Sequence, residues 1–118
     1  MMIKFDFEDG NGPVPAHKHS KGGGWVADTA NVTSTAYVGP DAKVYGNAEV
    51  SGKAWVCGKV YDNARVYGDA SVDMSAQVFG NAWVFDNAQV FGNSKVFGYT
   101  LVSGDAKVYG NAKVGGAA

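Results

Sequence analysis

The chain has 118 residues, 46% of them hydrophobic, and a formal net charge of −1. This length suits a single domain, and the charge gives no reason to expect nucleic acid or a membrane surface as a partner. The one cysteine, Cys57, excludes an internal disulfide, and no run of about 20 apolar residues is present that could span a bilayer. With no signal-peptide core at its start, the sequence predicts a cytoplasmic protein.

Residues 1–24 are predicted to form a cap that differs from the rest of the chain. Ile3, Phe5 and Phe7 alternate with charged residues, a pattern typical of a half-buried strand. The segment from Asp9 to Pro13 is typical of a turn. We therefore expect a strand or a hairpin in this segment.

Two histidines, His17 and His19, lie near the end of the predicted cap. In an extended segment their side chains project to the same side. Zinc usually takes three or four protein ligands, so two histidines make an incomplete site that only the meeting of several chains would complete. We predict no metal and no other cofactor, and expect solvated or capping histidines.

A valine recurs every sixth residue from Val26 to Val114, and a small residue, most often alanine, follows four places after nearly every valine. Between the two stands a turn dipeptide, most often Gly-Asn, Gly-Asp or Asp-Asn. A period of six fits neither an α-helix nor simple alternation, but it fits a short strand followed by a corner. Three such sides return the chain to its starting edge after 18 residues, so sixteen valines predict about five stacked coils.

The repeat is interrupted once, because Val56 is followed by Val60 instead of a valine six residues later. We predict that this slip tightens one corner and leaves the number of sides unchanged. The asparagines of the corners are predicted to form ladders of side-chain hydrogen bonds. They are Asn47, Asn63, Asn81, Asn87, Asn93 and Asn111.

If three sides are kept, residues 18 apart stack on one face and produce a column of aromatic side chains. A long exposed aromatic column is unusual on a soluble monomer, and charge-poor aromatic patches are typical of interface cores. We predict that this face binds another subunit, in a homodimer or homotrimer, or a different protein. The predicted contact residues are Tyr45, Tyr61, Phe79, Trp83, Phe97 and Leu101.

The repeat resembles that of left-handed β-helix proteins built from hexapeptides, in segments such as VYGNAEV, VYGDASV, VFGNAWV, VFDNAQV and VYGNAKV. The resemblance covers residues 26–114. It implies an all-β fold, a left-handed parallel β-helix that is a three-sided solenoid over residues 25–118. That family includes acyltransferases, γ-class carbonic anhydrases and non-catalytic members, so the resemblance says far less about function.

The enzymes of this family place histidines where this chain has none. Its acyltransferases commonly use a histidine at the cleft between subunits, and the γ-class carbonic anhydrases need three histidines from the coils. The predicted coils contain neither a histidine nor an insertion between hexads. We therefore predict a non-catalytic protein, with an acyl-CoA-dependent transferase that has a shared site near His17 or His19 as the alternative.

Residues 17–48 also resemble small hexapeptide proteins encoded by phages and prophages. The predicted function is a self-assembling, protein-binding scaffold. In a phage it would act in the host cytoplasm by binding and inhibiting a host protein, such as a component of a defence system. A virion fibre or glycan-binding element is a further alternative.

Overall fold

The computed structural model describes residues 3–73 and 75–115, which form three sheets and contain eighteen strands. Sheet 1 consists, in chain order, of β1 (Lys4–Asp6), β2 (Pro13–Lys18), β3 (Trp25–Ala27), β6 (Lys43–Val44), β9 (Lys59–Val60), β12 (Gln77–Val78), β15 (Lys95–Val96) and β18 (Lys113–Val114). Sheet 2 consists of β4 (Asn31–Val32), β7 (Glu49–Val50), β10 (Arg65–Val66), β13 (Trp83–Val84) and β16 (Leu101–Val102). Sheet 3 consists of β5 (Tyr37–Val38), β8 (Trp55–Val56), β11 (Ser71–Val72), β14 (Gln89–Val90) and β17 (Lys107–Val108).

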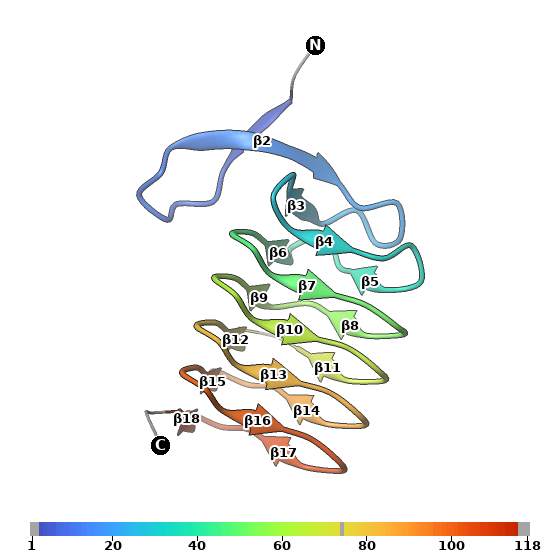
Figure 1. Ribbon diagram of the computed structural model, residues 1–118, viewed down its shortest axis with the longest axis vertical. Coiled ribbons are helices and arrows are strands. Elements are labelled where there is room, and N and C mark those ends of the chain that lie inside the picture. Colours follow the sequence, from blue (N-terminus) through green and yellow to red (C-terminus); the bar gives the residue numbers. More distant parts are fainter. Residues whose placement is uncertain (1–2, 74, 116–118) are drawn as a thin grey trace.

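From β3 onward the chain visits the three sheets in turn, and each visit adds a parallel strand to the one laid down a coil earlier (Figure 1). Val66, for example, pairs with Val50 in the preceding coil and with Val84 in the following coil. The predicted three-sided solenoid of about five coils is confirmed. The left-handed sense of the coil stays a prediction from the resemblance.

The core is a stack of valine and alanine side chains from all three sheets. Nearly all the repeat valines and alanines are buried, and most of them have no exposed surface. Ser94 takes an alanine position, and its hydroxyl donates to the carbonyl of Phe91 at 2.8 Å, so the polar group is satisfied. A coil of 18 residues buries too little surface to be stable alone, which makes stacking on neighbouring coils the source of stability.

The corners depend on glycine and aspartate with a left-handed backbone. Gly46 has φ of +68°, and Asp62 takes the equivalent place one coil later with φ of +60°. The predicted ladders of asparagine side chains are not what the hydrogen bonds show. Backbone hydrogen bonds connect successive corners instead. The N–H group of Asn47, for example, donates to the carbonyl of Asp62 at 2.8 Å. Backbone groups serve this purpose because each corner lies directly above the next.

The slip leaves the number of sides unchanged, as predicted. Val56 lies in β8 of sheet 3 and Val60 in β9 of sheet 1, the order followed everywhere else. The shortened corner keeps only Cys57 and Gly58. A Cβ atom on Gly58 would lie 2.2 Å from the carbonyl oxygen of Ala76, so glycine is needed here for space.

The predicted strand or hairpin at the start of the chain is also present. β1 pairs antiparallel with β2, and β2 pairs antiparallel with β3, so the hairpin extends sheet 1 beyond the first coil (Figure 1). Residues 1 and 2 of the predicted cap and residues 116–118 of the predicted repeat lie outside the described residues. Within the described residues, the fold contains no helix of the length and apolarity needed to cross a membrane.

Candidate functional site

Each sheet presents two outward side chains per coil, one before the valine and one after it. In sheet 1, for example, the hydroxyl of Tyr61, which follows Val60, donates to Oε1 of Gln77, which precedes Val78, at 2.9 Å. Both positions around a valine therefore belong to the same face. This rule decides where each predicted contact residue lies.

Four of the six predicted contact residues form one column on sheet 1. The ring centroids of Tyr45 and Tyr61 are 4.8 Å apart, those of Tyr61 and Phe79 are 4.9 Å apart, and those of Phe79 and Phe97 are 5.4 Å apart. Phe7 of the hairpin stacks on Tyr45 at 4.8 Å and covers the first ring. Tyr45 is only 7% exposed, and the other three rings are half-buried.

Burial also sets the chemistry of this column. It raises the pKa of Tyr45 to about 12, with the charges of Tyr61, Asp9 and Asp62 adding to the shift. The pKa of Tyr61 is raised as well, again mainly by burial. The column thus joins coils and hairpin, and offers less free surface than the sequence led us to expect.

Trp83 and Leu101 do not lie with this column, which corrects the sequence-based grouping. They belong to β13 and β16 of sheet 2, and Trp83 meets Tyr67 of the same sheet with ring centroids 6.3 Å apart. The error arose because Trp83 follows Phe79 closely in sequence. A corner separates the two residues, so their side chains leave different faces.

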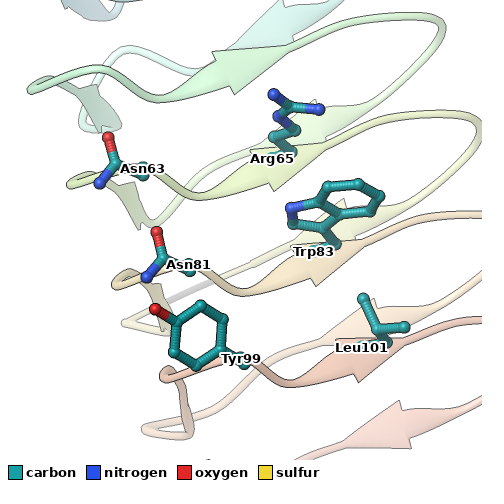
Figure 2. A pocket seen from close by; sticks show the side chains of 6 residues that line it. All are labelled: Asn63, Arg65, Asn81, Trp83, Tyr99 and Leu101. Atoms are coloured by element: carbon teal, nitrogen blue, oxygen red, sulfur yellow. The ribbon is translucent and has the colours of Figure 1, made fainter.

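Trp83 and Leu101 lie instead in a shallow groove on sheet 2, of about 590 Å³. Figure 2 shows two rows of side chains along successive coils, one on the strands and one at the corner. The lining residues are Asn63, Arg65, Asn81, Trp83, Tyr99 and Leu101. Trp83 is 36% exposed, Leu101 61% and Tyr99 74%, so the groove is the most open apolar surface on the strands of sheet 2.

Arg65 holds one side of this groove in place. Its guanidinium carbon lies 4.9 Å from the centroid of the Trp83 ring, and its Nε donates to Oε2 of Glu49 at 3.2 Å. The cation is therefore paired along the sheet with a carboxylate and an aromatic ring. The groove consequently presents apolar surface with its one charge already matched.

Tyr99 was not among the predicted contact residues. It occupies the corner position that carries Asn63 and Asn81 in the two preceding coils, as Figure 2 shows. The signal in the sequence was the dipeptide Gly98-Tyr99, where the repeat ordinarily has Gly-Asn or Gly-Asp. A large aromatic in a turn position serves no backbone purpose, so the departure marks a surface feature.

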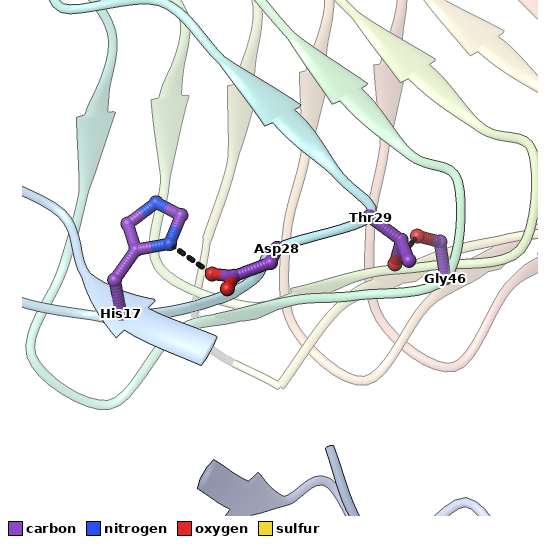
Figure 3. Close-up of polar contacts among 4 residues, drawn as sticks. All are labelled: His17, Asp28, Thr29 and Gly46. Atoms are coloured by element: carbon purple, nitrogen blue, oxygen red, sulfur yellow. Dashed lines mark hydrogen bonds and ion pairs between the residues drawn. The ribbon is translucent and has the colours of Figure 1, made fainter. Parts of the chain in front are cut away.

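The two histidines have separate environments. Nδ1 of His17 lies 2.7 Å from Oδ1 of Asp28, and both side chains are about half exposed (Figure 3). His19 is buried, and its Nε2 donates to the carbonyl of Ala36 at 2.8 Å. Among the described residues, no group of three or more His, Cys, Asp or Glu side chains is placed to hold a metal ion.

Figure 3 also shows Thr29, which follows Asp28, donating from its hydroxyl to the carbonyl of Gly46 one coil later. The segment that pairs with His17 is thereby tied to the second coil. His17 and Asp28 thus sit where the hairpin meets the solenoid, a position suited to attaching the cap.

Cys57 lies in the shortened corner, directly after β8 of sheet 3. Burial raises the pKa of its thiol, although a hydrogen bond from Nε1 of Trp55 to Sγ, at 3.1 Å, acts in the opposite direction. Tyr37 stacks on Trp55 with ring centroids 3.8 Å apart. Because a raised pKa favours the neutral thiol, this cysteine is poorly suited to act as a nucleophile.

Comparison with known families gives a match in the middle of the solenoid. Residues 42–58 and 59–72 match the family described as YdcK Beta solenoid repeat. The chain is a β-solenoid repeat protein. The two matched repeats meet between Gly58 and Lys59, at the shortened corner. The boundary between repeats in this β-solenoid therefore coincides with the slip in the hexapeptide period. Neither a curated protein nor a solved structure matches the chain.

Proposed function

We propose that this β-solenoid is a non-catalytic, self-assembling scaffold and that sheet 2 carries its protein-binding surface. The observation that carries the proposal is the groove in which Trp83, Tyr99 and Leu101 are exposed side by side. Trp, Tyr and Arg dominate the binding energy of protein interfaces, and Arg65 beside Trp83 completes such a group. The pairing of Arg65 with Glu49 limits the unmatched charge that binding would bury.

A second copy of the chain suits this surface by size and rigidity. The molecule measures 42 × 28 × 21 Å, so one side of it is of the order of the roughly 800 Å² per partner that stable interfaces bury. Every strand of sheet 2 is hydrogen-bonded to its neighbours in the stack. Little backbone ordering is then needed on association, and this favours affinity.

The absolute mass of the protein, measured by light scattering during size-exclusion chromatography at several concentrations, tests self-assembly. We expect a dimer or trimer whose dissociation constant rises at least about 30-fold in Trp83→Ser with Leu101→Ser, because anchor residues of this kind contribute 2 kcal/mol or more. The matched control is Trp55→Ser with Tyr109→Ser, which removes two exposed aromatics from sheet 3. That control should keep the mass of the unmodified protein.

A monomer at all concentrations would contradict self-assembly and leave sheet 2 free for a different protein, such as the host protein considered above. The double variant then separates the two readings in a capture experiment. A partner bound by the unmodified protein and by the sheet 3 control, but not by the sheet 2 variant, would support heterologous binding. Unchanged mass together with unchanged capture would mean that sheet 2 is only structural.

The placement of the histidines supports the non-catalytic part of the proposal. His19 is buried and its Nε2 bonds to a backbone carbonyl, and His17 is paired with Asp28. Both contacts serve the junction between the hairpin and the solenoid. Calorimetry with acetyl-CoA tests this part separately, since binding that His17→Ala abolishes would favour the acyltransferase alternative.

A further inference from the structure

A single row of side chains crosses seven strands of sheet 1 in register, and five of the seven are lysines. The pairing runs from β2 through β3, β6, β9, β12 and β15 to β18. The lysines are Lys18, Lys43, Lys59, Lys95 and Lys113, and the other two members are Trp25 and Gln77. The row contains half of the ten Lys and Arg residues of the chain and none of its 11 Asp and Glu residues.

The positive charges of this row are largely unmatched. Among the described residues only two ion pairs form, His17 with Asp28 and Arg65 with Glu49, and neither involves a lysine of the row. Like charges directly opposite one another on adjacent strands destabilise a sheet. Lys59 pairs with Lys43, and Lys95 pairs with Lys113, so this arrangement occurs twice.

The two ends of the row differ. Near the hairpin, the amine of Lys18 lies 5.6 Å from the centroid of the Trp25 ring, and that of Lys43 lies 5.8 Å from the centroid of the Phe5 ring. These two cations are partly satisfied by aromatic faces. The remaining stretch, from Lys59 to Lys113, has no such contact among the described residues.

Gln77 completes this stretch as a donor. The hydroxyl of Tyr61 donates to Oε1 of Gln77 at 2.9 Å, which occupies the acceptor end of the amide. The amide nitrogen, with its two hydrogens, is then the end available to a ligand. Lys59, Gln77, Lys95 and Lys113 therefore present four consecutive N–H donor groups, one per coil, over about 14 Å at the usual strand spacing of about 4.8 Å.

We propose that this row is a docking surface for an extended acidic segment of another protein, independent of the groove on sheet 2. Carboxylates on alternate residues of an extended segment repeat every 6.6–6.8 Å or so, and the flexible lysine stems can follow that repeat. A negative segment laid along the row would relieve the repulsion between stacked lysines and accept hydrogen bonds from Gln77. Charge complementarity of this kind gives orientation and partner selection.

The packing of the aromatic rings on this sheet favours a polypeptide over nucleic acid. Single-stranded nucleic acid binds by stacking its bases on exposed aromatic faces. In the column beside the row, however, Tyr61, Phe79 and Phe97 cover each other's faces, with ring planes inclined by 2° and 11°.

The test is fluorescence anisotropy with a labelled peptide of alternating Glu and Ser, and with a Gln and Ser peptide of equal length for comparison. We expect the acidic peptide to bind at low ionic strength with a dissociation constant below about 1 mM. Its binding should weaken as the salt concentration rises towards 0.15 M or so, and the neutral peptide should not bind. Lys59→Gln with Lys95→Gln should weaken binding about tenfold or more. Lys53→Gln with Lys107→Gln removes the same charge outside the row and should leave binding unchanged.

Three results would overturn the proposal. The first is no binding of the acidic peptide at low ionic strength. The second is equal weakening in both double variants, which would mean that net charge alone is responsible. The third is tighter binding of a thymidine oligonucleotide or a sulfated polysaccharide than of the peptide, which would assign the row to a different class of partner. Circular dichroism on each variant confirms that the fold is retained, and the Trp83 variant should bind the acidic peptide normally.

Discussion

Tyr45 lies between Phe7 of the hairpin and Tyr61 of the next coil, and its ionisation is opposed by the fold. Its pKa is about 12 in the folded protein and 10.0 in the unfolded chain. Because the folded value is the higher one, stability is complete below pH 10 and is lost as the pH rises towards 12. We expect this one residue to account for a loss of about 2 to 3 kcal/mol over that window.

Urea unfolding at pH 9 and pH 11 measures about half of this loss, roughly 1.3 kcal/mol, because pH 11 lies midway between the two pKa values. Tyr45→Phe keeps the aromatic ring and its contacts, so its main effect should be on the dependence of stability on pH. The variant should lose clearly less stability than the unmodified protein between the two pH values. Some loss will remain because the pKa of Tyr61 is also raised. The control is Tyr99→Phe, which removes a hydroxyl from an exposed ring. If both variants flatten the profile equally, burial of Tyr45 is not the cause.

The burial of Tyr45 also shows where sequence reasoning succeeds and where it stops. The column of Tyr45, Tyr61, Phe79 and Phe97 follows from counting coils across the slip, and the rings do stack. Phe7 was predicted only as part of a half-buried strand. Its contact with Tyr45 depends on how the hairpin folds back over the first coil, which no period in the sequence specifies.

At the scale of one element, the shortened corner makes a sharp prediction. Gly58→Ala would place Cβ 2.2 Å from the carbonyl oxygen of Ala76, a backbone atom that is held in the stack. We expect a loss of at least about 3 kcal/mol in the free energy of unfolding, at the upper end of the usual range for overpacking. The midpoint of urea unfolding, followed by circular dichroism, measures it.

Gly104→Ala is the matched control for this corner. Gly104 has φ of +63°, but nothing lies within 4 Å of the position that its Cβ would take. Its substitution should cost only the backbone strain, about 1 to 2 kcal/mol. A Gly58→Ala protein as stable as the Gly104→Ala protein would show that the coils separate easily at the slip, against the close stacking described above.

The sheet 2 groove was only partly predictable, because the position of each corner decides which face an outward residue belongs to. Valine and alanine point inward wherever they recur, so the number of sides and coils can be counted directly. The outward residues carry no such period, and their face depends on which side of a corner they stand. Trp83 and Leu101 were therefore identified as surface residues but grouped on the wrong face, and Tyr99 was missed because it replaces a turn residue.

The whole molecule behaves as a stack of interchangeable coils, and this can be tested by removing one. Deleting residues 77–94 joins Ala76 to Lys95, the residue that pairs with Gln77 in the next coil. Each sheet then continues without a change of register. We expect a cooperative unfolding transition with a lower m-value, since less surface is exposed on unfolding. Stability should fall by a few kcal/mol, the small difference between the burial of one coil and the entropy of ordering it.

The informative comparison is a deletion one residue shorter, of residues 77–93. Ser94 then takes the outward place of Gln77, and the charged Lys95 takes the inward place of Val78, which is fully buried. Val96 turns outward in that strand, because a shift of one residue exchanges the two faces of a strand. We expect this protein to lose its cooperative transition although it is one residue longer. If the two deletions were equally stable, inward packing of valine would not be what holds the coils in register.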